Sequence, residues 1–326
     1  MSNGRRIPEA DLKQVKTIPI ARRANKVESN LLAKAPAEPR TFDAFLDSLP
    51  AILAARDLRA VIADVAGAAR KKKAVVTLLG GHVIKVGLGP LLIHLIERGA
   101  LTHVAMNGAA AIHDFELAAF GGTSEDVAAG LGDGTFGMAE ETGREMNAAI
   151  AAGRGEGMGL GEALAHWLER RGASRGNEGG RDASVLLAAW RRGVPVTVHV
   201  ALGADIIHQH PDADGAATGE LTFRDFRRLA AALPGLDHGG VVLNLGSAVI
   251  LPEVFLKALT VARNLGAGQP THFTAVDCDM IRHYRPRLNV VQRPTQDGGA
   301  GYLLTGHHEL LLPLLVWGVD AALARR

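Results

Sequence analysis

Short apolar segments alternate with longer segments of helical periodicity along most of the chain. Six apolar runs lie at residues 74–79, 102–106, 194–200, 241–245, 271–276 and 288–292. Strands separated by helices pair in parallel, since a parallel pair needs a crossover connection, and continuous apolar strands indicate a sheet covered on both faces. The pattern therefore predicts an α/β fold with a doubly wound, mostly parallel six-stranded sheet of Rossmann-like arrangement.

The segments around this pattern suggest a single domain at residues 41–326, preceded by an N-terminal arm at residues 1–40. Thr41 opens an amphipathic helix that Pro50 kinks or divides. A glycine-rich, charged insert at about 121–181 carries helices near 138–152 and 160–171, and we expect it to form a lid or an interface rather than part of the sheet. The last helix spans about residues 309–324.

Composition narrows the functional classes. The 326 residues carry a formal net charge of +2 and 4% aromatic side chains, which argues against a nucleic-acid-binding surface. One cysteine, Cys278, rules out an intrachain disulfide. The first six residues do not form the apolar run of a signal peptide, and no long uncharged apolar stretch indicates a membrane span. We therefore expect a cytoplasmic protein.

Glycines and polar residues gather just after the predicted strands. Ligands of open parallel sheets bind beyond the carboxyl ends of the strands, where glycine allows close approach to the backbone. Helices that begin there direct their positive ends at the same crevice, so we expect a nucleotide-like ligand; the alternative is that these glycines only make tight turns. The candidate binding residues are Gly80, Gly81, His82, Asn107, Gly108, Asp205, Gly246 and Ser247.

Histidines near the strand ends suggest acid–base chemistry. The chain has 13 histidines, and imidazole is suited to proton transfer near neutral pH. We take His113, Asp114 and His208 as candidate catalytic residues. For His113 and Asp114 a structural role at the start of a helix is the alternative, because an acid there is favoured by the helix dipole.

A metal site is a second interpretation of the same histidines. His208 and His210, with an aspartate at 212 or 214, could supply ligands from one loop. Two histidines so close together on a loop often face solvent, so we assign no residue to a metal. Lys85 follows the first glycine loop, where it could bind phosphate or form a Schiff base.

The order of these segments resembles the deoxyhypusine synthase family over about residues 74–320. The motifs that carry the resemblance are GGHVIKVGL at 80–88, MNGAAAIHD at 106–114, SVLLAAWRRGVPVTVHVA at 184–201, VVLNLGSAV at 241–249 and HHELLLPLL at 307–315. The resemblance implies a Rossmann-like fold, NAD binding and tetramers with sites between subunits. It also implies transfer of an aminobutyl group from spermidine through an imine on a lysine. The implied cofactor contacts are Gly81, His82, Asn107, Gly108, Ala109, Asp114, Asp205 and Thr295.

The chain departs from that family at the reacting group. The family's lysine lies between the last strand and the terminal helix, whereas no lysine follows Lys257 here. Imine formation needs a primary amine, so we expect no deoxyhypusine synthesis. Ser247 and Ala248 also stand where the family has glycines.

Three functions follow as hypotheses. The first is an enzyme on a deoxyhypusine synthase-like scaffold, with NAD or another small nucleotide-like ligand. The second is a cofactor-binding sensor without turnover, and the third is a metal-dependent hydrolase built on the histidines. The apolar terminal helix and the arm predict a homodimer or homotetramer, with neither nucleic acid nor membrane as a partner.

Overall fold

The computed structural model describes residues 7–173, 176–266 and 269–325. Six strands form one sheet in the order β3-β2-β1-β4-β5-β6, and every neighbouring pair is parallel. The predicted α/β class, with a doubly wound parallel sheet, is confirmed. The strands are β1 (Val75–Leu79), β2 (His103–Asn107), β3 (Val196–His199), β4 (Val241–Leu245), β5 (Thr274–Asp279) and β6 (Ala300–Thr305).

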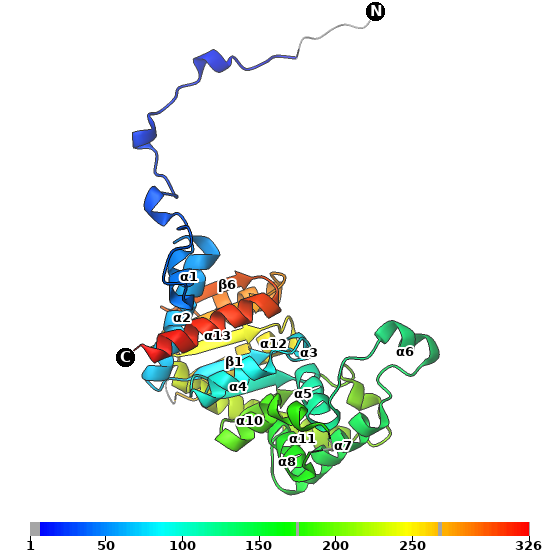
Figure 1. The fold of residues 1–326 in the computed structure, drawn as a ribbon. Coiled ribbons are helices and arrows are strands. Elements are labelled where there is room, and N and C mark those ends of the chain that lie inside the picture. Colours follow the sequence, from blue (N-terminus) through cyan, green and yellow to red (C-terminus); the bar gives the residue numbers. More distant parts are fainter. Residues whose placement is uncertain (1–6, 174–175, 267–268, 326) are drawn as a thin grey trace, which may run out of the picture.

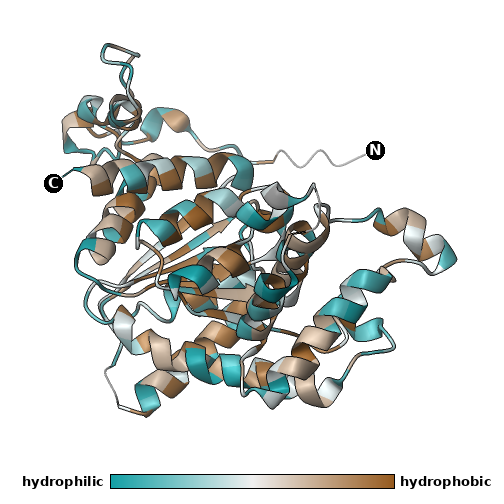
Figure 2. Cartoon of the chain, turned by 60° about the horizontal axis from the view of Figure 1, so that its bottom comes forward, coloured by the Kyte–Doolittle hydropathy of each residue, from teal (hydrophilic) through white to brown (hydrophobic). Residues whose placement is uncertain are grey.

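Alternate side chains of the strands enter two separate cores. In β1, Val75 and Leu79 pack into one core, and Val76 and Leu78 into the other. Figure 2 shows apolar helix faces turned toward the sheet and polar faces turned outward. The first core is covered by α2 (Leu53–Arg70), α4 (Gly89–Glu97), α5 (Gly108–Phe120), α10 (Val185–Arg192) and α13 (His308–Ala324), and the second by α11 (Gly215–Ala232) and α12 (Ile250–Asn264).

The amphipathic segment after Thr41 forms two helices. Thr41 caps α1 (Phe42–Ser48) by accepting a hydrogen bond from the Ala44 amide, and α2 begins at Leu53, beyond Pro50. Proline cannot donate an amide proton within a helix, which explains why the helix is divided there.

The sixth strand lies later in the chain than predicted. Residues 286–292, which contain the run LNVVQ, form a π-helical segment, η6 (Pro286–Gln292), that packs on α12 and β5. A short apolar run cannot be assigned to strand or buried helix from periodicity alone. The sixth strand is β6, which pairs with β5 at the edge of the sheet. A Cβ added to Gly301 in this strand would lie 2.7 Å from Val291 Cγ1, so glycine allows η6 to pack against β6.

The insert at 121–181 adds helices and no strand among its described residues; residues 174–175 lie outside them. Its helices are α6 (Val127–Asp133), α7 (Glu140–Gly155), α8 (Leu160–Arg171) and α9 (Glu178–Asp182). The helix α8 packs on β3 and α10, whereas α6 projects from the body beyond the carboxyl ends of the strands (Figure 1). The insert therefore covers one edge of the sheet and borders the edge where a ligand was expected.

The predicted arm extends away from the body (Figure 1). Its described part carries three short 3₁₀ turns, η1 (Leu12–Gln14), η2 (Ile20–Arg22) and η3 (Ser29–Leu31), and its first six residues lie outside the described part. Apolar side chains along it are exposed, including Ile7 at 88% and Leu12 at 78%. None of the described helices combines the length and the hydropathy needed to cross a membrane.

Candidate functional site

The carboxyl ends of all six strands lie at one edge of the sheet, because every pairing is parallel. The chain builds β1, β2 and β3 outward in one direction, then returns to the centre and builds β4, β5 and β6 in the other. This strand order creates a topological switch point between β1 and β4, which is where ligands bind in sheets of this kind. The helices α3 (Gly81–Lys85) and α5 begin at this edge.

The predicted glycines bring the loops at this edge into close contact. A Cβ on Gly80 would lie 2.0 Å from the Gly246 carbonyl oxygen, and one on Gly81 would lie 2.9 Å from Ala109 Cβ. A Cβ on Gly108 would lie 2.0 Å from Asp205 Oδ2. These three glycines are therefore needed for close packing between the loops.

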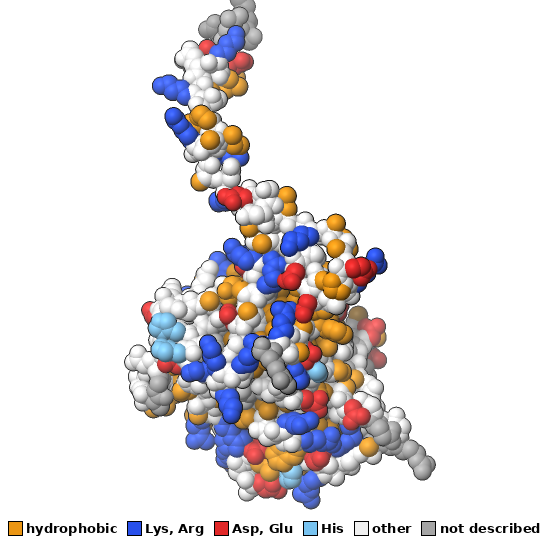
Figure 3. Space-filling model, turned by 60° about the vertical axis from the view of Figure 1, so that its left-hand side comes forward, with side chains coloured by type: hydrophobic (Ala, Val, Ile, Leu, Met, Phe, Trp, Pro, Cys, Tyr) orange, Lys and Arg blue, Asp and Glu red, His pale blue; other side chains and the backbone are white. Residues whose placement is uncertain are grey.

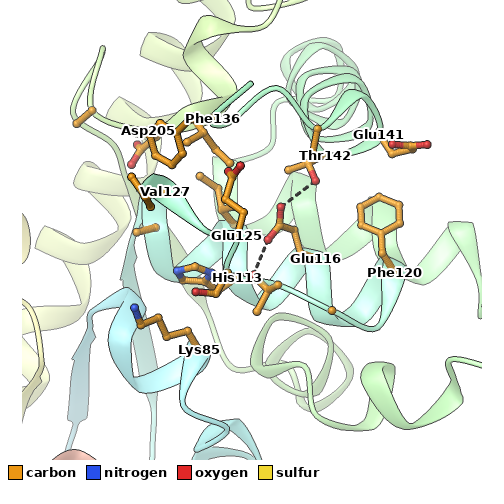
Figure 4. A pocket seen from close by; sticks show the side chains of 18 residues that line it. Lys85, His113, Glu116, Phe120, Glu125, Val127, Phe136, Glu141, Thr142 and Asp205 are labelled. Carbon is orange, nitrogen blue, oxygen red and sulfur yellow. Dashed lines mark hydrogen bonds between the residues drawn. The ribbon is translucent and has the colours of Figure 1, made fainter. Parts of the chain in front are cut away.

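A cavity of about 740 Å³ opens beside these loops, between α5, the insert and the segment after β3. Figure 4 shows Lys85 and His113 at one end of the cavity, Glu116 in the middle below Thr142, and Asp205 across from His113. Three predicted residues line it, namely Ala109, His113 and Asp205. Its volume falls within the range of about 300–1,000 Å³ that is usual for small-molecule sites.

A chain of hydrogen bonds orients His113 within the cavity. The Thr123 hydroxyl donates to Glu116 Oε2 in a short hydrogen bond, so its oxygen is free to accept from His113 Nδ1, which lies 2.7 Å away. The Thr142 hydroxyl donates to the other oxygen, Glu116 Oε1, at 2.9 Å. This arrangement places the proton of a neutral His113 on Nδ1 and leaves Nε2 as an acceptor.

Burial lowers the pKa of His113, and the nearby Lys85 ammonium lowers it further. The imidazole is therefore neutral at pH 7 and can act as a base through Nε2. The spacing of His113 and Glu116, three residues apart on α5, was a signal in the sequence that they share a helix face. Thr142 comes from the insert, and nothing in the sequence pointed to it.

Asp205 is a half-buried acid on the cavity wall. Burial raises its pKa from the usual 3.8 to about 6. Its Oδ2 is buried and accepts no hydrogen bond from any residue that the structure describes. Gly108 covers this oxygen, so a ligand hydroxyl or amine would approach the carboxylate of Asp205 from the cavity side. A carboxylate oxygen without a donor is costly, which makes Asp205 suited to such a ligand group.

Asp114 is directed into the core and away from the cavity. Its carboxylate accepts hydrogen bonds from the Ser184 hydroxyl at 2.6 Å and from the amides of Val185 and Leu186 at 2.7 and 3.1 Å. It therefore caps α10, and we leave it out of the proposed site.

His208 lies near the cavity but does not line it. Its Nδ1 accepts a hydrogen bond from the Gly203 amide at 3.2 Å, and its Nε2 is buried without a partner among the described residues. His210 Nδ1 lies 3.7 Å from Asp212 Oδ2. Among the described residues of this loop, no three side chains place potential metal-ligand atoms close enough to share an ion. The geometry therefore does not favour the hypothesis of a metal-dependent hydrolase built on these histidines.

Thr295 lies just before the amino end of β6, which is the outermost strand on the side of the sheet remote from β3. Its hydroxyl donates to the Val291 carbonyl at 2.6 Å, and its own carbonyl accepts from the Gly299 amide just before β6. Because β6 begins at Ala300, Thr295 precedes the last strand instead of following it. The structure thus does not bring Thr295 together with the other predicted cofactor contacts.

A second polar group lies at the ends of β4 and β5. The rings of His82 and His308 are 5.4 Å apart, and His308 is buried with Nε2 at 3.2 Å from the Cys278 carbonyl oxygen. Asn244 donates to Asp277 across the paired strands at 2.7 Å, and burial raises the pKa of Asp277 to about 6. These groups lie on the β4 side of the switch point, where the predicted residues Gly246 and Ser247 follow β4. The Ser247 hydroxyl accepts a hydrogen bond from the Leu251 amide at 3.3 Å.

Comparisons with known proteins support the fold. No protein-family model matches the chain, and no curated protein matches it. Among solved structures it is similar to a candidate deoxyhypusine synthase from Entamoeba histolytica, with 14% identity and a TM-score of 0.50 over 87% of this chain and 94% of that one. It is also similar to a candidate LOR/SDH protein from Methanococcus maripaludis S2, with 14% identity and a TM-score of 0.49 over 92% of this chain and 74% of that one.

Two larger enzymes also match. They are the arginine dihydrolase ArgZ of cyanobacteria, with 16% identity and a TM-score of 0.49, and AgrE in complex with ornithine and NAD⁺, with 19% identity and a TM-score of 0.47. The match covers 83% of this chain with ArgZ and 82% with AgrE, but only 33% of the length of either enzyme. At these identities the comparisons describe architecture alone: the chain has the deoxyhypusine synthase-like α/β fold.

Proposed function

We propose that the chain binds NAD, or a closely related nucleotide-like ligand, at the carboxyl ends of its strands. The observation that carries the proposal is the cavity beside the switch point, with the unpartnered Oδ2 of Asp205 facing the start of α5. In sheets with this strand order, an acidic residue commonly accepts a hydrogen bond from a ribose hydroxyl. Asp205 has the chemistry for that contact.

Charge in the cavity supports an anionic group on the ligand. Lys85 is exposed on the cavity wall, and a flexible ammonium suits a phosphate partner. The N-terminal end of α5, which lies next to Asp205, adds a positive dipole. Phe120 and Phe136 add apolar surface to the cavity wall. The donors, acceptor and apolar wall together fit a nucleoside phosphate.

The residues of the cavity would perform separate tasks. Asp205 would hold the sugar, Lys85 would hold a phosphate, and His113 would take a proton from a substrate through Nε2. NAD supplies hydride transfer when it is bound. The acceptor position of His113 depends on Thr123 and Glu116, which orient the ring without reaching the ligand themselves.

We propose no deoxyhypusine synthesis for this chain. That reaction needs a lysine amine near the last strand, and no lysine follows Lys257. Lys85 comes from α3, on the β1 side of the switch point, and so does not replace the missing lysine in position.

Calorimetric titration of the full chain with NAD⁺, NADP⁺ and ATP tests the proposal. We expect NAD⁺ to bind, and we expect Asp205→Asn to weaken binding at least tenfold because the amide loses the charge and one acceptor oxygen. Asp212→Asn is the matched control, since Asp212 is an exposed aspartate that does not line the cavity. Absence of nucleotide binding in the wild type, or equal affinity in Asp205→Asn, would overturn the assignment.

We also propose that the chain assembles into a homodimer or homotetramer. The support is the row of exposed apolar side chains on the arm, which the rest of the same chain leaves uncovered.

A further inference from the structure

Three potential metal ligands meet at the amino ends of β4 and β5, on the edge of the sheet opposite the cavity. Asp237 and His238 precede β4, and His272 precedes β5. Since β4 and β5 are parallel neighbours, their entry loops lie side by side. None of the three residues lines the cavity described above, so this site is separate from it.

Hydrogen bonds hold the two loops together. The Gly239 amide donates to the His272 carbonyl at 2.8 Å, and the Thr271 amide donates to Asp237 Oδ1 at 3.1 Å. The Thr274 amide donates to the Gly240 carbonyl at 2.9 Å. The backbone therefore fixes the relative position of the three side chains before any ion binds.

The side chains present their donor atoms to one point. One donor atom from each of Asp237, His238 and His272 lies within 4.8 Å of the others. Ligands at about 2.0–2.2 Å from a tetrahedral ion are separated by about 3.4 Å, so small side-chain rotations would complete the geometry. His238 Nδ1 is already 3.1 Å from Asp237 Oδ1, and the two imidazole rings meet edge to face with centroids 4.9 Å apart.

The surroundings leave this point open to an ion. His238 and His272 are exposed, and Asp237 is half-buried. Figure 3 shows two histidine side chains next to each other on the surface of the molecule. The nearby Lys73 ammonium binds the backbone carbonyl of Asp237, at 3.0 Å, instead of its carboxylate. The Thr271 hydroxyl lies 2.8 Å from His272 Nδ1 and helps to hold that ring in place.

We propose that Asp237, His238 and His272 bind a divalent transition metal ion, with water at the remaining positions. Two imidazoles and one carboxylate favour Zn²⁺, Ni²⁺ or Co²⁺ over Mg²⁺ and Ca²⁺, which prefer oxygen ligands. The ion joins the loop before β4 to the loop before β5. Because metal bound to the native state stabilises it, the ion fastens the central strands at the edge remote from the cavity.

The test is Zn²⁺ binding to the full chain after chelator treatment, measured by equilibrium dialysis and by thermal unfolding with and without ZnCl₂. The variants are His238→Asn and His272→Ala, alone and together. Asparagine is chosen at 238 because the backbone there has a φ of +57°, a conformation that asparagine tolerates. His94→Ala is the matched control, because His94 pairs with Asp320 at 2.9 Å and Arg98 occupies the same carboxylate oxygen.

We expect the wild type and His94→Ala to bind one more Zn²⁺ per chain than the double variant. Each single variant should bind that ion at least tenfold more weakly, and the rise in melting temperature with Zn²⁺ should disappear. Equal Zn²⁺ binding in the wild type and the double variant overturns the site, as does a loss confined to one of the single variants. Circular dichroism without metal checks that all variants are folded, and MgCl₂ should produce no shift.

Discussion

We expect Asp114 to stabilise the folded protein and to take no part in catalysis. Its carboxylate accepts three hydrogen bonds at the start of α10, from one hydroxyl and two amides. Replacing Asp114 with alanine leaves both buried amides without an acceptor, at about 1.5 kcal/mol each, and removes the hydrogen bond from Ser184, at about 1 kcal/mol. We therefore expect the free energy of unfolding to fall by about 4 kcal/mol at pH 5.

The loss of unfolding free energy caused by Asp114→Ala should depend on pH. Burial raises the pKa of Asp114 from 3.8 to about 6, so the folded state holds this proton more tightly than the unfolded state. The stability that the wild-type residue contributes is thus greatest at low pH and declines as pH rises toward and through about 6. From these pKa values, the cost of Asp114→Ala should shrink by roughly 1 kcal/mol between pH 5 and pH 8.

Thermal unfolding followed by circular dichroism measures this effect. A loss of about 4 kcal/mol corresponds to a fall in melting temperature of roughly 8 °C for a domain of this size. Asp114→Asn, which keeps one acceptor oxygen, should lose less. A fall below about 2 °C together with loss of NAD⁺ binding would refute the capping role and return Asp114 to the site.

Two further predictions concern a buried acid and the assembly. Burial raises the pKa of Asp225 to about 7. Its Oδ2 accepts hydrogen bonds from the Gly161 and Val198 amides at 2.9 and 2.8 Å, whereas Oδ1 accepts no hydrogen bond from the described residues and lies 3.8 Å from Arg228 Nη1. Asp225→Asn should therefore gain stability relative to the wild type by roughly 2–3 kcal/mol on going from pH 5 to pH 8 in urea titrations, and a difference independent of pH would contradict this. Light scattering of the full chain should give a multiple of 34.3 kDa, and a mass of 34.3 kDa would contradict the proposed assembly.

The order of the elements could be predicted because strands that are buried on both faces of the sheet occur in the sequence as continuous apolar runs. The runs at 74–79 and 241–245 correspond closely to β1 and β4, whose side chains are all buried. The edge strand β6 could not be found in this way, since five of its six residues are only half-buried or exposed and two glycines come just before it. In the neighbouring run Val290 and Val291 are buried, because η6 packs on α12 and β5.

The candidate site was predictable where it depends on strand ends alone. His113 and Asp205 follow β2 and β3, so parallel pairing brings them to one cavity. Thr142 reaches the cavity through the folding of the insert, and the capping of α10 by Asp114 links residues seventy positions apart. Contacts of that kind depend on tertiary packing, which hydrophobic periodicity does not report. Thr295, which the family resemblance implied as a cofactor contact, precedes the last strand because the run at 288–292 is helical and β6 begins at Ala300.

Glu116 connects two parts of the molecule. One of its oxygens binds Thr142 on α7, and the other binds Thr123 in the segment that leaves α5. Thr123 and Thr142 both belong to the insert, so the carboxylate of Glu116 fastens two separate segments of the insert to α5. Thr142→Val should remove the hydrogen bond to Glu116 Oε1 and leave in place the Thr123 contact that orients His113.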